Sequence, residues 1–350
     1  MTFRLPAALV LSAALVAPTL SEACSRAVYF GLEGQTITGR TMDWYSPMGS
    51  NQWLYPRGLE RNSNTATPLV WTSKYGSVVT TIYEGGAADG MNEAGLVANL
   101  LYLAEAEYPP EVEGDTRPTL PVSAWVQYVL DQYATTAEAV EGLRAETFRI
   151  VPVVAPSGEP GTLHLSISDA SGDSAIFEYI DGKLVIHHGR EYQVMTNSPR
   201  FEDQQALAAY WMKIGGQVML PGTSRAADRF ARLSYYINSA EQTADPRRAV
   251  ATVFSIMRTV SVPIGINVPG QPNIADTLWY AVADQKNRVY YFQDTNSPSL
   301  IWTDLKALDF SEGSGPRKLQ LDGNPDLAGN QTANFQPAEL FKFLSPDAPH

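Results

Sequence analysis

The sequence contains one cysteine, Cys24, in a chain of 350 residues. A single cysteine cannot form an intrachain disulfide, so a hydrophobic core has to stabilise whatever fold the chain adopts. Apolar residues make up 44% of the chain, which is enough for a large core. The length fits one domain or two. Because neither an internal repeat nor a linker is visible, we expect a single domain over residues 24–350.

The segment before Cys24 has the features of a secretory signal peptide. A short basic start is followed by the apolar run 5–18, which has the length of a signal-peptide core and is short for crossing a bilayer. Ser21 and Ala23 are small residues at the two positions that a signal peptidase recognises. We therefore expect residues 1–23 to be removed by cleavage between Ala23 and Cys24, and the mature protein to be periplasmic or secreted.

A lone thiol in an oxidising compartment has three interpretations: an unused remnant, a lipid attachment site or a nucleophile. Lipoprotein processing favours an aliphatic residue three positions before the cysteine, where this chain has Ser21 followed by Glu22. Cleavage before Cys24 would instead place a free α-amine and a thiol on one residue. The amine titrates near neutrality and can take the thiol proton, directly or through a water. We favour the nucleophile, because processing then creates its base as well.

Charge and histidine content exclude other classes of function. The net charge of −12 disfavours a nucleic-acid partner, whose phosphates would be repelled. No segment after the leader is apolar enough to span a membrane, so we expect no stable membrane anchor. The spacing of the four histidines indicates no metal site, and we expect neither a metal nor an organic cofactor. All four fit ordinary core or surface positions: His164, His187, His188 and His350.

Turn signals and apolar spacing predict hairpins and helices in separate groups. Strands 28–30 and 36–43 form a hairpin that begins at Cys24, and Asp181-Gly182 predicts a second hairpin. Alternating polar and apolar residues predict a half-buried strand at 163–168. The grouping favours antiparallel sheets covered by helices, in an α+β layered domain. A capping box at Thr135–Glu138 predicts a helix that begins at residue 136, and the other predicted helices are 122–133, 201–214, 224–240 and 246–259. The other predicted strands are 174–180, 184–187, 192–196, 275–283 and 289–293. We expect the tail after residue 308 to follow the surface.

Five short motifs follow one another in the order that they have in a known family. They are Cys24-Ser25-Arg26, Gly39-Arg40-Thr41-Met42-Asp43-Trp44, Asp89 to Leu96, Thr196-Asn197-Ser198-Pro199 and Ala226 to Phe230. With the cleavable N-terminus they resemble the choloylglycine hydrolases, the penicillin V acylases and bile salt hydrolases of the N-terminal-nucleophile (Ntn) hydrolase superfamily, over about residues 24–345. The chain is most similar to the Gram-negative penicillin V acylase branch, which also includes enzymes that cleave N-acyl homoserine lactones. The resemblance implies a four-layer αββα sandwich of antiparallel sheets.

The resemblance implies catalytic roles on the first hairpin. Cys24 would be the nucleophile, with its own α-amine as the base. The guanidinium of Arg40 would favour the thiolate, and the carboxylate of Asp43 would orient the α-ammonium. Positions 40 and 43 face opposite sides of a regular strand. Both can reach Cys24 only through a bulge, at a strand end, or if one acts through its backbone.

The same resemblance assigns an oxyanion hole and a second arginine. The side-chain amide of Asn197 and the backbone N–H of Tyr102 would hold the oxyanion of the tetrahedral intermediate. Arg229 would offset negative charge at the site. Arg225 and Arg232 lie at i−4 and i+3 from it, and spacing does not choose among the three.

Aromatic residues near these motifs are candidates for an acyl pocket. We expect Trp44 and Tyr102 to bind substrate, and Trp53 and Tyr108 to pack in the core. Bile salt hydrolases usually carry Asn where this chain has Tyr102, which disfavours bile salts.

The sequence therefore predicts hydrolysis of linear amide C–N bonds through an N-terminal cysteine acyl-enzyme of the EC 3.5.1 type. The expected partner is a small acyl amide: phenoxyacetyl penicillin first, and N-acyl homoserine lactones as a further substrate class. The alternatives are bile salt hydrolysis, acyl transfer and, from another class, a lipid-anchored periplasmic binding protein. The resemblance also implies a homo-oligomer, a tetramer.

Overall fold

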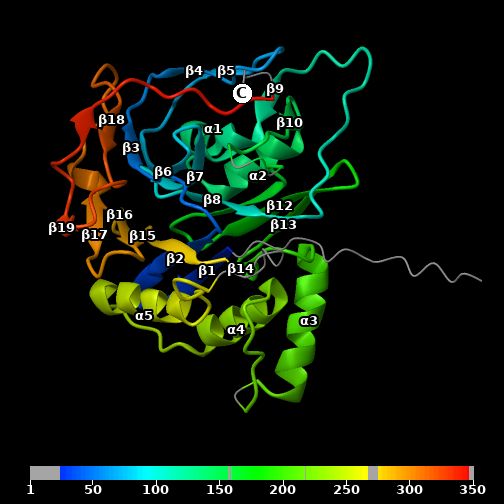
Figure 1. The fold of residues 1–350 in the computed structure, drawn as a ribbon, viewed down its shortest axis with the longest axis vertical. Coiled ribbons are helices and arrows are strands. Elements are labelled where there is room, and N and C mark those ends of the chain that lie inside the picture. The colour runs from blue at the N-terminus through cyan, green and yellow to red at the C-terminus, as the bar shows by residue number, and fades with distance from the viewer. Residues whose placement is uncertain (1–23, 157, 159, 217, 267–274, 347–350) are drawn as a thin grey trace, which may run out of the picture.

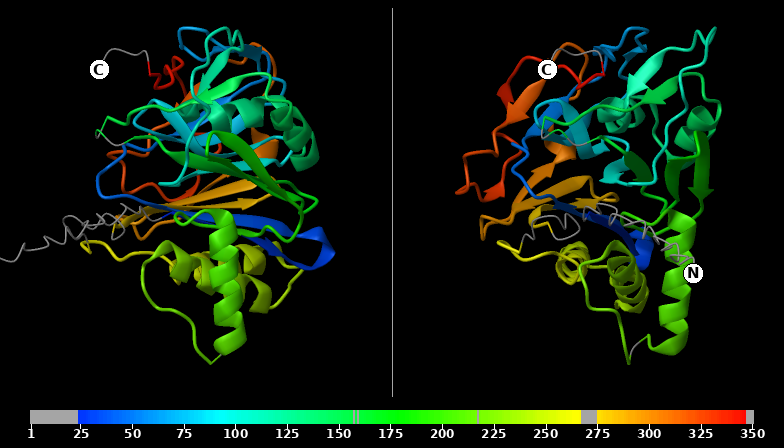
Figure 2. Two further views of the ribbon diagram at one scale, coloured as in Figure 1. Left: turned by 90° about the vertical axis from the view of Figure 1, so that its right-hand side faces the viewer. Right: turned by 45° about the vertical axis from the view of Figure 1, so that its right-hand side comes forward.

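The computed structural model describes residues 24–156, 158, 160–216, 218–266 and 275–346. The predicted signal peptide lies outside them. The chain folds into four layers, which Figures 1 and 2 show from three sides. Two large sheets stack face to face, and helices cover the outer face of each. The predicted αββα sandwich is confirmed.

The seven-stranded sheet carries the N-terminal hairpin at its centre. Helices α4 (Ala226–Ser239) and α5 (Pro246–Arg258) cover its outer face, and α3 (Phe201–Ile214) packs against α4. All neighbours are antiparallel except the last pair, β17 and β19. Its strands in spatial order are β14 (Val194–Met195), β1 (Ser25–Phe30), β2 (Thr36–Asp43), β15 (Thr277–Asp284), β16 (Val289–Asp294), β17 (Ile301–Asp304) and β19 (Gly329–Asn330).

The nine-stranded sheet is antiparallel throughout and is covered by α1 (Trp125–Gln132) and α2 (Thr136–Arg144). Its strands in spatial order are β13 (Lys183–His188), β12 (Ser174–Ile180), β11 (Leu163–Ser168), β8 (Val97–Tyr102), β7 (Gly86–Asn92), β6 (Ser77–Ile82), β3 (Gln52–Tyr55), β18 (Arg317–Leu319) and β20 (Gln336–Pro337). Two small sheets pair β4 (Glu60–Asn62) with β5 (Val70–Thr72), and β9 (Thr119–Pro121) with β10 (Arg149–Val151). Three short 3₁₀ helices complete the described elements: η1 (Leu32–Gly34), η2 (Val122–Ala124) and η3 (Leu305–Ala307).

Local sequence signals account for several of these elements. The predicted hairpin behind Cys24 is confirmed as β1 and β2. The second hairpin turns at Asp181 and Gly182, whose φ angles are both positive, at 51° and 72°. Glycine adopts such angles at little cost, and aspartate tolerates them.

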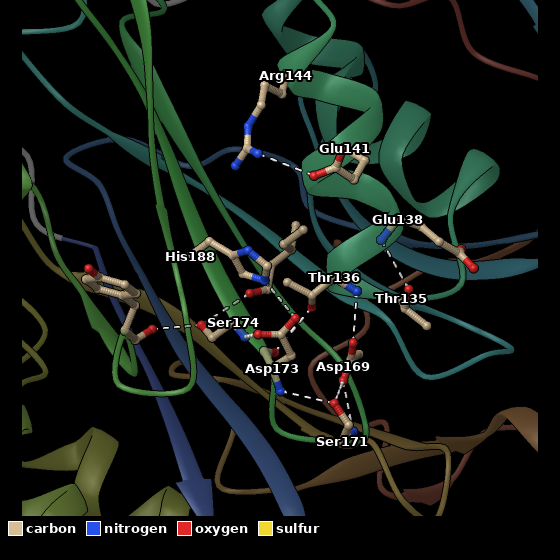
Figure 3. Close-up of polar contacts among 12 residues, drawn as sticks. Thr135, Thr136, Glu138, Glu141, Arg144, Asp169, Ser171, Asp173, Ser174 and His188 are labelled. Atoms are coloured by element: carbon tan, nitrogen blue, oxygen red, sulfur yellow. Dashed lines mark hydrogen bonds and ion pairs between the residues drawn. The ribbon is translucent and has the colours of Figure 1, made fainter.

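The capping box before α2 is present in part. Figure 3 shows Thr135 accepting a hydrogen bond from the Glu138 N–H at 3.2 Å. The Glu138 carboxylate accepts from Ala134 N rather than from the capping residue. Figure 3 also shows the Asp169 carboxylate, from the turn after β11, accepting from Thr136 N at 2.8 Å. This contact joins the start of α2 to the nine-stranded sheet.

The prediction of a half-buried strand at 163–168 is wrong, because β11 is covered on both faces. Leu165 and Ile167 pack under α1 and α2, as expected for the apolar face. His164 and Ser168 are also buried, because their face of β11 lies against the seven-stranded sheet. Ser168 Oγ is 2.8 Å from Thr38 Oγ1 of β2. The alternation therefore reflects a polar layer between the two sheets rather than a solvent-facing side.

The tail after residue 308 does more than follow the surface. It adds β18 and β20 to one edge of the nine-stranded sheet and β19 to the edge of the other. Its composition, rich in turn-forming residues, predicts none of these short strands. The tail also buries Phe335 and Phe343 against the body of the protein.

Gly39 on β2 allows α5 to pack closely on the sheet. A Cβ atom there would lie 2.5 Å from Val253 Cγ1 and 2.8 Å from Met257 Cγ. We expect Gly39→Ala to lower the free energy of unfolding by about 1–3 kcal/mol, because an extra methyl group in a packed layer displaces its neighbours. Gly222→Ala is the control, because no atom lies within 4 Å of that position. Urea unfolding measures both, and equal stability of the two variants would contradict this packing.

Candidate active site

Cys24 lies immediately before β1, with 3% of its surface exposed. Its backbone nitrogen is 2.6 Å from Asn197 Oδ1. Its Sγ is 3.8 Å from the backbone oxygen of Asp43 and 4.0 Å from Arg40 Nη2. Three of the motifs singled out in the sequence therefore meet at this residue.

Arg40 and Asp43 approach Cys24 from different faces of β2. The Arg40 guanidinium lies between the sheets, where it donates to the Leu100 carbonyl at 2.9 Å and lies over the Trp279 ring. The Asp43 carboxylate lies on the other face and accepts from Thr277 Oγ1 at 2.6 Å. The pairing of β2 with β15 is irregular between Thr277 and Trp279. The strand therefore ends in an irregularity, and it is the backbone oxygen of Asp43 that contacts the thiol.

Burial governs the protonation of this pair. It raises the pKa of the Cys24 thiol, and the positive charge of Arg40 opposes the increase without cancelling it. Burial also raises the pKa of Asp43 to about 7, against the opposing effects of Arg229 and the Thr277 hydrogen bond. The thiol therefore needs a nearby base to ionise at neutral pH, because Arg40 alone does not produce a thiolate.

Asn197 uses both ends of its side-chain amide. Oδ1 accepts from the Cys24 nitrogen and, at 2.8 Å, from Arg229 Nη2, while Nδ2 donates to the Tyr102 carbonyl at 2.7 Å. In the pairing of β8 with β11, Tyr102 is opposite Leu163, and the next residue, Leu103, donates to Thr162. The alternation of an antiparallel ladder then directs the backbone groups of Tyr102 away from β11, toward Asn197.

Of the three arginines on and beside α4, Arg229 is the one turned into the site. It is fully buried and donates through Nη1 to the Cys24 carbonyl at 2.5 Å. Nη1 also donates to Ser25 Oγ, and Nε donates to the Ser224 carbonyl. Arg225 is exposed, and Arg232 donates to backbone carbonyls of the preceding loop.

A buried histidine–glutamate pair supports the segment that carries Asn197. His164 Nε2 is 2.8 Å from the Thr196 carbonyl, and Nδ1 is 3.0 Å from Glu178 Oε1. Each ring nitrogen therefore lies within hydrogen-bond distance of an oxygen. Glu178 also accepts from Phe201 N at the start of α3. The sequence predicts an ordinary core role for His164, and neither spacing nor motif indicates its partner Glu178.

An apolar pocket opens beside the thiol. Trp44 and Tyr102 both line it, and their ring centroids are 6.4 Å apart at an interplanar angle of 68°. Trp53 and Tyr108 lie elsewhere, as predicted: Trp53 packs against Phe341, and the Tyr108 hydroxyl donates to the Leu163 carbonyl. The lining residues are Cys24, Arg40, Met42, Trp44, Met48, Ile82, Tyr83, Gly86, Ala87, Ala88, Leu100, Tyr102, Ser123, Val153, Ala155, Pro160, Gly161, Leu163 and Leu344.

Within the described part of the chain, no group of three or more histidine, cysteine, aspartate or glutamate side chains could hold a metal ion. In the same residues, no helix is both long enough and apolar enough to cross a membrane.

Known proteins are similar to this chain in sequence and in fold. A sequence model of the linear amide C-N hydrolases, choloylglycine hydrolase family, matches residues 24–320. The chain is 45% identical to a penicillin V acylase from Pectobacterium atrosepticum, with 96% of each chain covered. It is 25% identical to a bile salt hydrolase/transferase from Bifidobacterium longum subsp. longum, covering 77% of this chain and 90% of the relative.

Solved structures give the same result. A penicillin V acylase from Agrobacterium tumefaciens superimposes with a TM-score of 0.86 at 49% identity, covering 92% of this chain and 100% of the other. A conjugated bile acid hydrolase from Clostridium perfringens shares the fold, with a TM-score of 0.72 at 22% identity over 85% of this chain and 97% of that one.

The four layers and the site between them define an Ntn hydrolase. The chain belongs to the choloylglycine hydrolase family of linear amide C–N hydrolases and is an amidohydrolase.

The buried pair predicts how stability depends on pH. Burial by itself raises the pKa of Glu178. Hydrogen bonds from His164, His187 and the Phe201 N–H have the larger, opposite effect, and the resulting pKa is about 2. Ionised Glu178 therefore stabilises the fold above pH 4.5, its ordinary pKa, and this contribution is lost as the pH falls toward 2. The full contribution is about 3 kcal/mol.

We expect Glu178→Gln to lose stability less steeply than the wild type between about pH 5 and pH 2. Urea unfolding at several pH values measures this slope. Glu141→Gln, at an exposed position on α2, is the matched control and should keep the wild-type slope. A wild-type slope in Glu178→Gln would contradict the stabilising contribution of ionised Glu178.

Proposed function

We propose that the mature chain is one domain that begins at Cys24 and cleaves linear acyl amides by nucleophilic attack of the Cys24 thiolate. One observation carries the proposal. The Cys24 nitrogen lies 2.6 Å from Asn197 Oδ1, while its thiol faces an apolar pocket. A free α-amine at that position would be held by Asn197 with the thiol on the same residue, within reach of its proton.

The reaction proceeds in two halves. The α-amine of Cys24 takes the thiol proton, and the thiolate attacks the amide carbonyl. The amide N–H of Asn197 and the backbone N–H of Tyr102 stabilise the oxyanion, and the α-ammonium then protonates the leaving amine. Water attacks the resulting thioester, its proton returns to the thiol, and the acid leaves.

The charged residues position and stabilise the reacting groups, and they neither form a bond with the substrate nor transfer a proton. Arg229 donates to the Cys24 carbonyl and to Asn197, so it fixes the first residue and the oxyanion donor together. Arg40 places positive charge 4.0 Å from the thiol. Asp43 balances both guanidiniums and stabilises the α-ammonium from the opposite face of β2.

Phenoxyacetyl penicillin is the substrate that the observations favour. Two relatives at 45% and 49% identity are penicillin V acylases. The pocket beside the thiol is apolar and has an aromatic wall, which suits a flat phenoxy group. The same wall suits flexible alkyl chains, so N-acyl homoserine lactones are a further substrate class.

Two alternatives have less support. The relative with bile salt activity is only 25% identical. A lipid-anchored binding protein would carry its lipid on the Cys24 thiol, yet that thiol is buried and faces the pocket. We further propose that the mature enzyme is periplasmic or secreted and forms a homotetramer.

The exported protein should begin at Cys24 with an unmodified α-amine, because only cleavage there provides the base. Intact mass and N-terminal sequencing measure this. A cytoplasmic form with Met directly before Cys24 should turn over substrate only after that Met is removed. An N-terminus at Ala23 in active protein, or a diacylglyceryl adduct, would contradict the proposal.

We expect kcat/KM to be higher for phenoxyacetyl penicillin than for glycine or taurine conjugates of bile acids. Trp44→Ala should raise KM for phenoxyacetyl penicillin, because it removes contact area in the pocket. Alkylation of Cys24 by iodoacetamide should change little, because the thiol keeps its charged neighbours. Trp211→Ala on α3, which does not line the pocket, is the control.

Bile salt conjugates that were cleaved tenfold better than phenoxyacetyl penicillin would contradict this assignment. Addition of a free amine acceptor to the same assays separates hydrolysis from acyl transfer, because a transferase forms a new amide instead of the free acid.

A further inference from the structure

Among the described residues, the lining of the pocket beside Cys24 includes a residue from the C-terminal tail. This residue is Leu344. The family match covers residues 24–320 and so does not include this position. A part of the chain outside the matched family region therefore forms a wall of the candidate acyl site.

Backbone hydrogen bonds hold Leu344 in place on two sides. Its N–H donates to the Gly85 carbonyl at 2.7 Å, in the turn between β6 and β7. Its own carbonyl accepts from Ser123 Oγ of η2 at 2.6 Å. Its side chain lies so close to the turn that a Cβ atom on Gly85 would be 2.6 Å from Leu344 Cγ.

Aromatic contacts anchor the segment around Leu344. Phe341 meets Trp53 edge to face, with ring centroids 5.4 Å apart. Phe343 stacks on Trp71, with centroids 6.2 Å apart. Trp53 belongs to the nine-stranded sheet and Trp71 to β5, so the tail is packed onto the body of the domain in the residues just before Leu344. Leu344 is therefore a fixed wall of the pocket.

Leu344 and Cys24 come from opposite layers of the sandwich. Figure 1 places the C-terminal end of the described chain beside β9, on the side of the nine-stranded sheet that α1 covers, whereas β1 lies on the other side. Two neighbouring residues of β7 line the pocket between them and face opposite sides of the sheet. Ala87 packs in the core under the helices, and Ala88 packs in the core between the two sheets. The pocket therefore extends past β7. Ser123 and Leu344 therefore line the part of the pocket remote from Cys24.

We propose that Leu344 is a specificity-determining residue that closes the remote part of the acyl pocket and limits the length of the acyl group. This inference rests on the proposed function, in which the carbonyl carbon of the acyl group is at Cys24. An acyl chain extending from there runs past β7 and ends against the Leu344 side chain. Each methylene that still fits inside the pocket raises kcat/KM by about fourfold, and the next one meets Leu344 and gains nothing.

The test uses straight-chain N-acyl homoserine lactones from butanoyl to hexadecanoyl with the full mature chain. Leu344→Ala should move the chain length of maximal kcat/KM upward by about two carbons, and it should raise kcat/KM for the longest chains by about tenfold. Leu344→Trp should move the maximum to shorter chains. Leu340→Ala, in the same tail but outside the pocket lining, should keep the wild-type profile.

A second measurement reports pocket length without turnover. Straight-chain fatty acids should protect Cys24 from iodoacetamide with the same dependence on length, and Leu344→Ala should shift that dependence in the same direction. A wild type that cleaves no lactone and no penicillin would contradict the proposed function, while the protection series still tests Leu344. Identical length profiles for the wild type, Leu344→Ala and Leu344→Trp in either measurement would overturn the role of Leu344 alone.

Discussion

The hydrogen bond between Asn197 Oδ1 and the Cys24 nitrogen joins the proposed oxyanion donor to the proposed nucleophile, and the rest of the arrangement depends on it. Asn197 also donates to the Tyr102 carbonyl on the nine-stranded sheet, and Arg229 bonds both Asn197 and the Cys24 carbonyl. One amide therefore connects the residue that precedes β1, the end of β8 and helix α4. Since the amide and guanidinium are both buried, losing either would leave an unpaired polar group in the core.

Burial places the Cys24 thiol beside an apolar pocket and also raises the pKa of the thiol. Arg40 supplies charge from between the sheets, yet the net direction stays upward, so the site depends on a base. In the proposed mechanism, the α-amine on the same residue meets that need without a second side chain, and the pocket can then be lined almost wholly by apolar groups. This division explains how an apolar acyl site can adjoin a charged cluster of Arg40, Asp43 and Arg229.

The sequence predicts those elements and site residues that local patterns or short motifs mark. The first hairpin and helices α3–α5 follow from turn residues and helical periodicity, and the motifs indicate Cys24, Arg40 and Asn197. Strands β6–β8 are missing from the prediction because they are buried on both faces, so no alternation marks them, and β7 consists largely of small residues. Contacts between distant segments, such as those of Glu178 with Phe201 or Leu344 with Gly85, leave no local pattern. Arg40 and Asp43 both reach Cys24 because β2 ends in an irregularity of its pairing with β15. Residue spacing does not predict this irregularity.

The central claim is that Cys24, freed at its α-amine, forms a covalent acyl-enzyme. The most direct measurement is the intact mass of mature protein quenched within milliseconds of mixing with phenoxyacetyl penicillin, followed by peptide mapping. We expect one phenoxyacetyl group as a thioester on the N-terminal Cys24 peptide, and its disappearance as the free acid accumulates. Turnover without any adduct on Cys24, or an adduct on another residue that decays at the rate of turnover, would contradict the account.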